Sequence, residues 1–160
     1  MKELFKNQIV KNILAALAVA FFGFILLNLT FLFDFLYQSA IRGLLGLFIP
    51  LNPDTNLIWL PLLFHGSFVV IIGIISWFVF RTKLRVLYKA IYMTVPVAVV
   101  LATVGIFLYR WQVISYSAGG LLCIGTLYYF YRTKQPWIYY YTLILVSLTL
   151  AIYTLTGGEI

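Results

Sequence analysis

The stretch 13-ILAALAVAFFGFILLNLTFLF-33 decides the class of this protein, because it contains no charged residue. A helix that rises about 1.5 Å per residue needs roughly 20 apolar residues to cross a hydrocarbon core of about 30 Å. The run is too long for the core of a signal peptide, and no small-residue cleavage site accompanies it. We therefore predict a membrane span that the mature protein keeps.

The composition of the whole chain also indicates a membrane protein. Of its 160 residues, 64% are hydrophobic and 9% are charged. Soluble domains have about 25% charged residues, and a chain of this size cannot hide so much apolar surface from water. We expect an all-α integral membrane bundle, with residues 1–160 as a single domain. The net charge of +7 fits the basic cytoplasmic loops of membrane proteins, so no nucleic-acid partner is expected.

Four further apolar runs have the length of a membrane-spanning helix. None carries lysine or arginine near its centre, where either would cost about 2.5–3.5 kcal/mol on the insertion scale. The predicted spans are therefore five, and they cover residues 13–33, 57–80, 90–109, 113–131 and 137–156.

The basic residues predict the orientation of these spans. They gather before the first span, between the second and third, and between the fourth and fifth, which leaves Arg42 and Arg110 on the opposite side. Lysine and arginine accumulate in cytoplasmic loops. We expect a multi-pass protein of the plasma membrane, with a cytoplasmic N-terminus and an external C-terminus.

The segment 39-SAIRGLLGLFI-49 is too short to cross the membrane comfortably, and it contains Arg42. Its residues Ile41, Leu44, Leu45 and Phe48 follow the spacing of one helix face. This pattern is typical of a helix that lies on the membrane surface. We expect a short interfacial or re-entrant helix after the first span.

The stretch 51-LNPDTNLIWLPLLFHG-66 holds the only histidine of the chain, His65. Asn-Pro-Asp-Thr-Asn is typical of a turn, and Asp54 can cap the helix that follows. Pro61 suits the first turn of that helix, which places His65 towards the outer interface. A histidine and a carboxylate inside a membrane protein are also candidates for chemistry.

Polar residues from several segments are predicted to meet in the outer half of the bundle. The candidate acid–base or metal-binding groups are His65 and Asp54, and the candidate ligand-binding residues are Asp34, Asn52 and Arg110. The chain lacks the paired histidines of a zinc site, a nucleophile elbow and a glycine-rich phosphate loop. No resident metal or cofactor is therefore expected.

Small residues recur four positions apart in the later spans, as in Ser115 with Gly119 and Ser147 with Ala151. Such pairs let membrane helices approach one another closely. We therefore expect these small residues to pack helices together.

No acid or arginine occupies the centre of a span. A proton-driven antiporter or a voltage sensor would require such a residue there, so neither function is expected.

The sequence favours a non-enzymatic membrane protein, either a transport component or a subunit of a larger membrane complex. Membrane lipids are expected partners, together with other membrane subunits or further copies of this chain. The alternative is an outer-leaflet enzyme that acts on a lipid or lipid-linked substrate through Asp54 and His65. No motif is specific enough to indicate a family.

Overall fold

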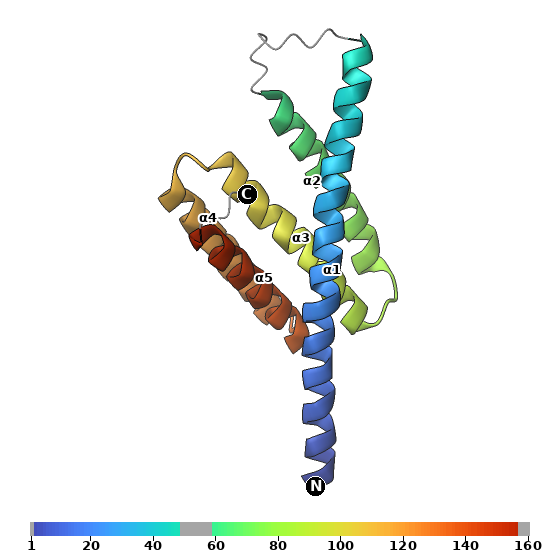
Figure 1. Ribbon diagram of the computed structural model, residues 1–160. Helices are drawn as coiled ribbons and strands as arrows, with labels where there is room; N and C mark the ends of the chain where they lie inside the picture. The colour runs from blue at the N-terminus through green and yellow to red at the C-terminus, as the bar shows by residue number, and fades with distance from the viewer. Residues whose placement is uncertain (1, 49–58, 157–160) are drawn as a thin grey trace.

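The computed structural model describes the backbone of residues 2–48 and 59–156 and the side chains of residues 7–47 and 63–156. These residues form five α-helices, and no strand occurs among them. In chain order they are α1 (Lys2–Phe48), α2 (Trp59–Arg81), α3 (Val86–Phe107), α4 (Gln112–Arg132) and α5 (Trp137–Leu155), as Figure 1 shows. All five are long and apolar enough to cross a membrane. The predicted all-α set of five membrane-length helices is confirmed.

The last four helices lie close to the predicted spans. The largest difference is at the start of α3, which begins at Val86 and includes Lys89 in its first turns. The ammonium group of Lys89 stays outside the apolar part of the bundle, because it donates to the carbonyl oxygen of Phe80 at 2.8 Å. That carbonyl lies in the last turn of α2, where the helix has no backbone donor left for it.

The first helix differs from the expected pattern. α1 is a single helix of 47 residues, which makes it about 70 Å long. A separate short helix at 39–49 does not occur, because residues 39–48 continue α1 and residue 49 lies outside the described part of the chain. The cause is local: the segment DFLYQ at 34–38 has neither the proline nor the glycine that would end a helix. The interfacial position of this segment stays a prediction.

The centre of the bundle is α3, which packs against each of the other four helices. Its buried small residues Ala90, Ala98 and Ala102 allow its neighbours to approach closely. At its contact with α1, a Cβ atom added to Gly23 would lie 2.6 Å from Cγ2 of Thr94. The crossing of α1 and α3 therefore requires a glycine at position 23.

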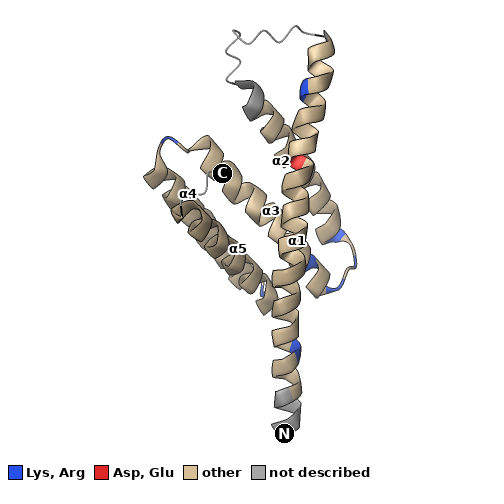
Figure 2. Ribbon diagram, in the orientation of Figure 1, with Lys and Arg blue, Asp and Glu red and all other residues tan. Residues whose placement is uncertain are grey.

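The two ends of the bundle differ in charge. We call the end with the α2–α3 and α4–α5 turns, at 82–85 and 133–136, the basic end; Figure 2 shows basic residues on the α2–α3 turn. The larger part of the core lies there and contains Val19, Ala90, Met93, Phe130, Ile138, Tyr139 and Leu143. The far end has the α3–α4 turn at 108–111, and α1 extends past the other helices (Figure 1).

Candidate functional site

The polar side chains of three helices meet at His65, on the second turn of α2. His65 is buried, with 8% of its surface exposed. Its Nε2 atom lies 3.0 Å from the hydroxyl oxygen of Thr103 on α3, and its Nδ1 atom lies 3.5 Å from a carboxylate oxygen of Asp34 on α1. We call Asp34, His65 and Thr103 the polar bridge.

The hydrogen bonds around Thr103 place a proton on Nε2 of His65. The Thr103 hydroxyl donates to the carbonyl oxygen of Val99 at 2.6 Å, so its oxygen accepts from Nε2–H of His65. The Nδ1 atom on the other side of the ring faces Asp34 at 3.5 Å. The imidazole of His65 thus lies between a side chain of α1 and a side chain of α3.

The carboxyl group of Asp34 has spare capacity for another partner. Its Oδ2 atom faces His65, whereas its Oδ1 atom is buried and has no hydrogen-bond partner among the described residues. A buried oxygen without a partner raises the free energy of the folded protein by about 1–3 kcal/mol. Asp34 therefore contacts His65 through one oxygen, at an ion-pair distance, and leaves its other oxygen for a further partner.

A second polar contact lies beside the bridge and joins the same two helices. The Tyr37 hydroxyl on α1 lies 2.9 Å from the hydroxyl oxygen of Ser67 on α2. Because Ser67 donates to the carbonyl oxygen of Phe64 at 2.7 Å, Tyr37 is the donor to Ser67. The Tyr37 ring also packs on Phe68, with 6.0 Å between ring centroids.

Helix geometry places the polar bridge at the far end. Ala15 packs in the core at the basic end, and Asp34 follows it by 19 residues, or about 28 Å along α1. His65 is about 24 Å along α2 from Arg81, and Thr103 is about 25 Å along α3 from Val86. All three residues therefore lie towards the far end of their helices, at a distance from the basic end that is close to the roughly 30 Å thickness of a membrane core.

The predicted site residues have different outcomes. Asp34 and His65 are in contact, whereas Asn52 and Asp54 lie outside the described residues. Arg110 lies apart on the α3–α4 turn, where its Nε–H donates to the Tyr109 hydroxyl at 3.1 Å. This hydrogen bond raises the pKa of Arg110 above its ordinary value, which keeps the guanidinium group charged.

Thr103 and the Tyr37–Ser67 contact were not predicted. Thr103 lies 38 residues from His65 in the sequence, within an apolar run where threonine commonly bonds its own helix. The one available signal was that a buried imidazole needs a partner for each ring nitrogen. That requirement does not identify which hydroxyl group in the neighbouring helices supplies it.

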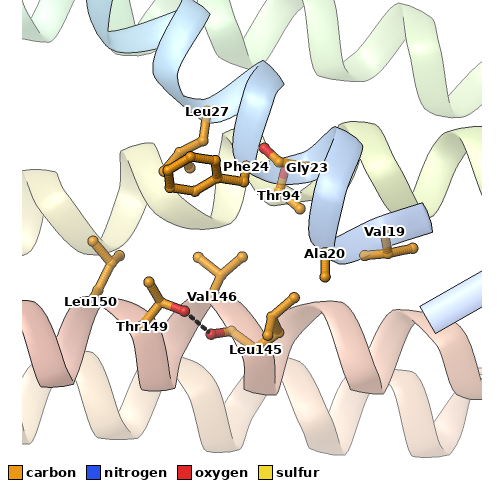
Figure 3. Close-up of a pocket in the computed structure, with 10 residues that line it drawn as sticks. All are labelled: Val19, Ala20, Gly23, Phe24, Leu27, Thr94, Leu145, Val146, Thr149 and Leu150. Carbon is orange, nitrogen blue, oxygen red and sulfur yellow. Dashed lines mark hydrogen bonds between the residues drawn. The ribbon is translucent and has the colours of Figure 1, made fainter. Parts of the chain in front are cut away.

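The cavities described in the bundle are separate from the polar bridge. One of about 110 Å³ lies between α1, α3 and α5 and is lined by ten residues, among them Gly23, Phe24, Thr94 and Val146. Figure 3 shows that its walls are mainly apolar and that the Thr149 hydroxyl donates to the Leu145 carbonyl oxygen, at 2.8 Å. A larger cavity of about 370 Å³ lies between α3, α4 and α5. Asp34 and His65 line neither cavity.

The polar bridge can therefore join α1, α2 and α3. No group of three His, Cys, Asp or Glu side chains that could hold a metal ion occurs in the described part of the chain. Two ligands fall short of the three or four that protein zinc sites use.

Comparisons with known proteins gave no match. No protein-family model, no curated protein and no solved structure matches this chain.

Proposed function

We propose that this protein is a non-enzymatic, multi-pass subunit of a larger complex in the plasma membrane, with its N-terminus in the cytoplasm. The orientation is supported by the basic end, because lysine and arginine accumulate on the cytoplasmic side. The part of α1 beyond Asp34 is the surface that contacts the next subunit. This part of α1, residues 35–47, is called the α1 extension.

One observation carries the proposal: the α1 extension is mainly apolar, and apart from the side that carries Tyr37 most of its apolar side chains are exposed. Leu47 lies 13 residues beyond Asp34, or about 20 Å further along the helix. The exposed fractions are 67% for Phe35, 59% for Leu44 and 79% for Leu47. Beyond the boundary marked by the polar bridge, such side chains would face headgroups or water.

An apolar surface of this kind favours association. Removing apolar area from water contributes about 25 cal/mol per Å², and exposed apolar patches mark interaction sites. A membrane-embedded neighbour that rises past the same boundary would cover the α1 extension. The short interfacial helix expected from the sequence is the competing arrangement, in which headgroups cover it.

The polar bridge supports the non-enzymatic part of the proposal. Both ring nitrogens of His65 face partners on neighbouring helices, and the residue is buried. A catalytic histidine needs one nitrogen within reach of a substrate proton. In this arrangement the bridge sets the direction in which α1 leaves the bundle.

Photo-crosslinking in the native membrane tests the proposal. The photoreactive amino acid p-benzoylphenylalanine replaces Leu47 in cells that make the protein, and the membranes are irradiated. We expect a discrete protein–protein adduct, which mass spectrometry identifies as this chain or another membrane subunit. The matched control is Phe78 on α2, which is 65% exposed and lies within the span, where we expect lipid adducts.

Two outcomes would contradict the proposal. The first is that position 47 yields only lipid adducts, which would favour the interfacial arrangement. The second is that positions 47 and 78 yield the same protein adducts, which would indicate unspecific crowding in the membrane. Replacing Arg42, which lies within the α1 extension, by glutamine leaves the apolar residues in place and should preserve the adduct.

A second function is favoured by the contact between Asp34 and His65. An outer-leaflet enzyme would use this acid–base pair on a lipid or lipid-linked substrate, after His65 releases Thr103. Liposomes made from the total lipid extract of the source cells would then change in lipid composition when the purified protein is added. His65→Ala and Asp34→Asn would each abolish that change, and unchanged lipids with the native protein would exclude this function.

A further inference from the structure

The larger of the two cavities described above lies beside α4, which is held mainly at its two ends. At the basic end Phe130 of α4 packs on Tyr139 and Tyr140 of α5, with ring centroids 6.1 Å and 5.6 Å apart. At the far end the short turn at 108–111 ties α4 to α3. Phe130 is the one residue of α4 that is buried. Between these two attachments the three helices leave the cavity of about 370 Å³, which we call the α4 groove.

Glycines create much of the space in the α4 groove. A Cβ atom added to Gly120 would meet no atom within 4 Å, and one added to Gly119 would lie 3.8 Å from Leu101. Small residues had been expected to bring the helices together, yet Ser115, Gly119, Ser147 and Ala151 all line the groove. Its volume falls within the roughly 300–1,000 Å³ of small-ligand sites.

Three of the polar side chains in the groove, Cys123, Ser147 and Thr154, already have partners. The Cys123 sulfur atom lies 3.1 Å from the hydroxyl oxygen of Ser147, and the Thr154 hydroxyl donates to carbonyl oxygens of its own helix at 3.1 Å and 3.0 Å. The other walls include Leu101, Val104 and Leu148. Because most of its walls are apolar, the groove suits a mainly apolar occupant.

A polar hollow lies at the far-end opening of the groove. It measures about 440 Å³ and is lined by Arg110, Gln112 and their neighbours from Tyr109 to Ile114. Gln112 is one helical turn before Ser115 and Tyr116, which line the groove, so these residues share a face of α4. The hollow and the groove thus follow one another along the same helix.

Arg110 supplies a positive charge at this opening. It is exposed, its guanidinium carbon lies 5.8 Å from the centroid of the Tyr109 ring, and it has no carboxylate partner within the described residues. Arginine matches the geometry of phosphate oxygens with two parallel N–H donors. We therefore expect the ligand of Arg110 to carry a phosphate group.

We infer that the α4 groove and Arg110 together bind one anionic phospholipid from the leaflet at the far end. An acyl chain lies in the groove between Gly119, Gly120 and Ala151, and the phosphate of the headgroup contacts Arg110. The length of the groove suits an acyl chain, because Ser115 and Cys123, which both line it, are about 12 Å apart along α4. This site is independent of the proposed contact through the α1 extension.

Lipid retention measured by native mass spectrometry tests the inference. The full chain is placed in nanodiscs with equal amounts of phosphatidylglycerol and phosphatidylcholine and is then released into mild detergent. We expect one phosphatidylglycerol molecule per chain, held about tenfold more tightly than phosphatidylcholine. Both headgroups carry a phosphate, but the choline group adds a positive charge that weakens the attraction to Arg110. Equal retention of both lipids would overturn the inference.

Two variants separate the headgroup contact from the groove. Arg110→Gln should reduce phosphatidylglycerol retention about tenfold, to the level of phosphatidylcholine. Gly120→Leu should abolish retention of both lipids, because the new side chain occupies the space of the acyl chain. Retention that is unchanged in either variant would contradict the proposed site.

The chain offers a matched control for each variant. Gly125 is also on α4 and also has no atom within 4 Å of an added Cβ, but it does not line the groove; Gly125→Leu should therefore retain the lipid. Arg81, at the basic end, lies 4.3 Å from the centroid of the Trp77 ring, and Arg81→Gln should also have no effect. Loss of the lipid in a control would show that the effect is not local.

A measurement on the unmodified protein does not depend on the folding of any variant. Cys123 is the only cysteine of the chain and lines the groove, so its rate of alkylation by N-ethylmaleimide reports access to this space. We expect added phosphatidylglycerol to slow alkylation several-fold and phosphatidylcholine to have little effect. An unchanged rate with phosphatidylglycerol would overturn the inference.

Discussion

The far end of the bundle contains two regions that are built in opposite ways. Where α1, α2 and α3 meet, the contacts of His65 with Asp34 and Thr103 lie beside an apolar cluster that includes Phe68 and Val99. Where α3, α4 and α5 meet, glycines and small residues leave a cavity of about 370 Å³. Polar contacts hold the first three helices in one arrangement, whereas missing side chains make room beside α4.

The difference follows from the physics of helix association in lipid. Apolar side chains gain little by leaving lipid tails for one another, so packing and interhelical hydrogen bonds determine which helices associate. The polar bridge provides such bonds. In the α4 groove the polar atoms of Cys123 and Ser147 are paired with each other, and the remaining surface is suited to an apolar chain.

The largest expected effect comes from breaking the polar bridge at its centre. His65→Ala leaves the Asp34 carboxyl group mostly buried with neither oxygen paired, which should lower the free energy of unfolding by about 3 kcal/mol. Thermal unfolding in detergent measures the loss. The double variant His65→Ala with Asp34→Ala should recover part of it, and strictly additive losses would show that the two residues are not coupled.

The next effect tests the role of glycine where two helices touch. Gly23→Ala places a methyl group 2.6 Å from Cγ2 of Thr94, so it should lower the free energy of unfolding by about 1–3 kcal/mol through overpacking. Gly43→Ala is the control, since no atom lies within 4 Å of its added Cβ. Equal stability of the two variants would show that α1 and α3 are not in tight contact at Gly23.

A smaller effect is expected from removing the hydroxyl group of the bridge. Thr103→Val keeps the shape of the side chain but leaves Nε2–H of His65 without an acceptor, at a cost of about 1 kcal/mol. Modification by diethyl pyrocarbonate, followed at the His65 peptide by mass spectrometry, should be slow in the native protein and several-fold faster in Thr103→Val. Rapid modification of His65 in the folded native protein would contradict its burial.

The smallest effect concerns the contact next to the bridge. Tyr37→Phe removes the donor to Ser67 and should lower the free energy of unfolding by about 0.6 kcal/mol, the average for hydrogen bonds between membrane helices. The exposed Tyr128 is the control, because Tyr128→Phe should leave unfolding unchanged. If Tyr37→Phe proved as harmful as His65→Ala, the bridge would not be the main polar contact of this region.

Particular residues show how far the sequence could predict the site. Asp34 and His65 were both expected in the outer half, because each lies at a predictable depth in its span, and they do meet. Their partner Thr103 could not be predicted, since it is one of many hydroxyl residues in apolar helices. Small residues at 115, 119, 147 and 151 predicted close packing, but they line a cavity; their spacing alone does not show whether a neighbouring helix fills the space.

Helix length and apolar composition are properties of a local stretch of sequence. The residues alone therefore predict an all-α protein with five helices long enough to cross a membrane. They also predict the charge difference between the two ends. The three-dimensional structure was needed to show that α1 continues to Phe48 and that His65 contacts Asp34 and Thr103. It was also needed to show that a cavity lies between α4 and α5 at Gly120. These features depend on which helix faces meet, and apolar faces that look alike in the sequence leave that choice to the three-dimensional packing.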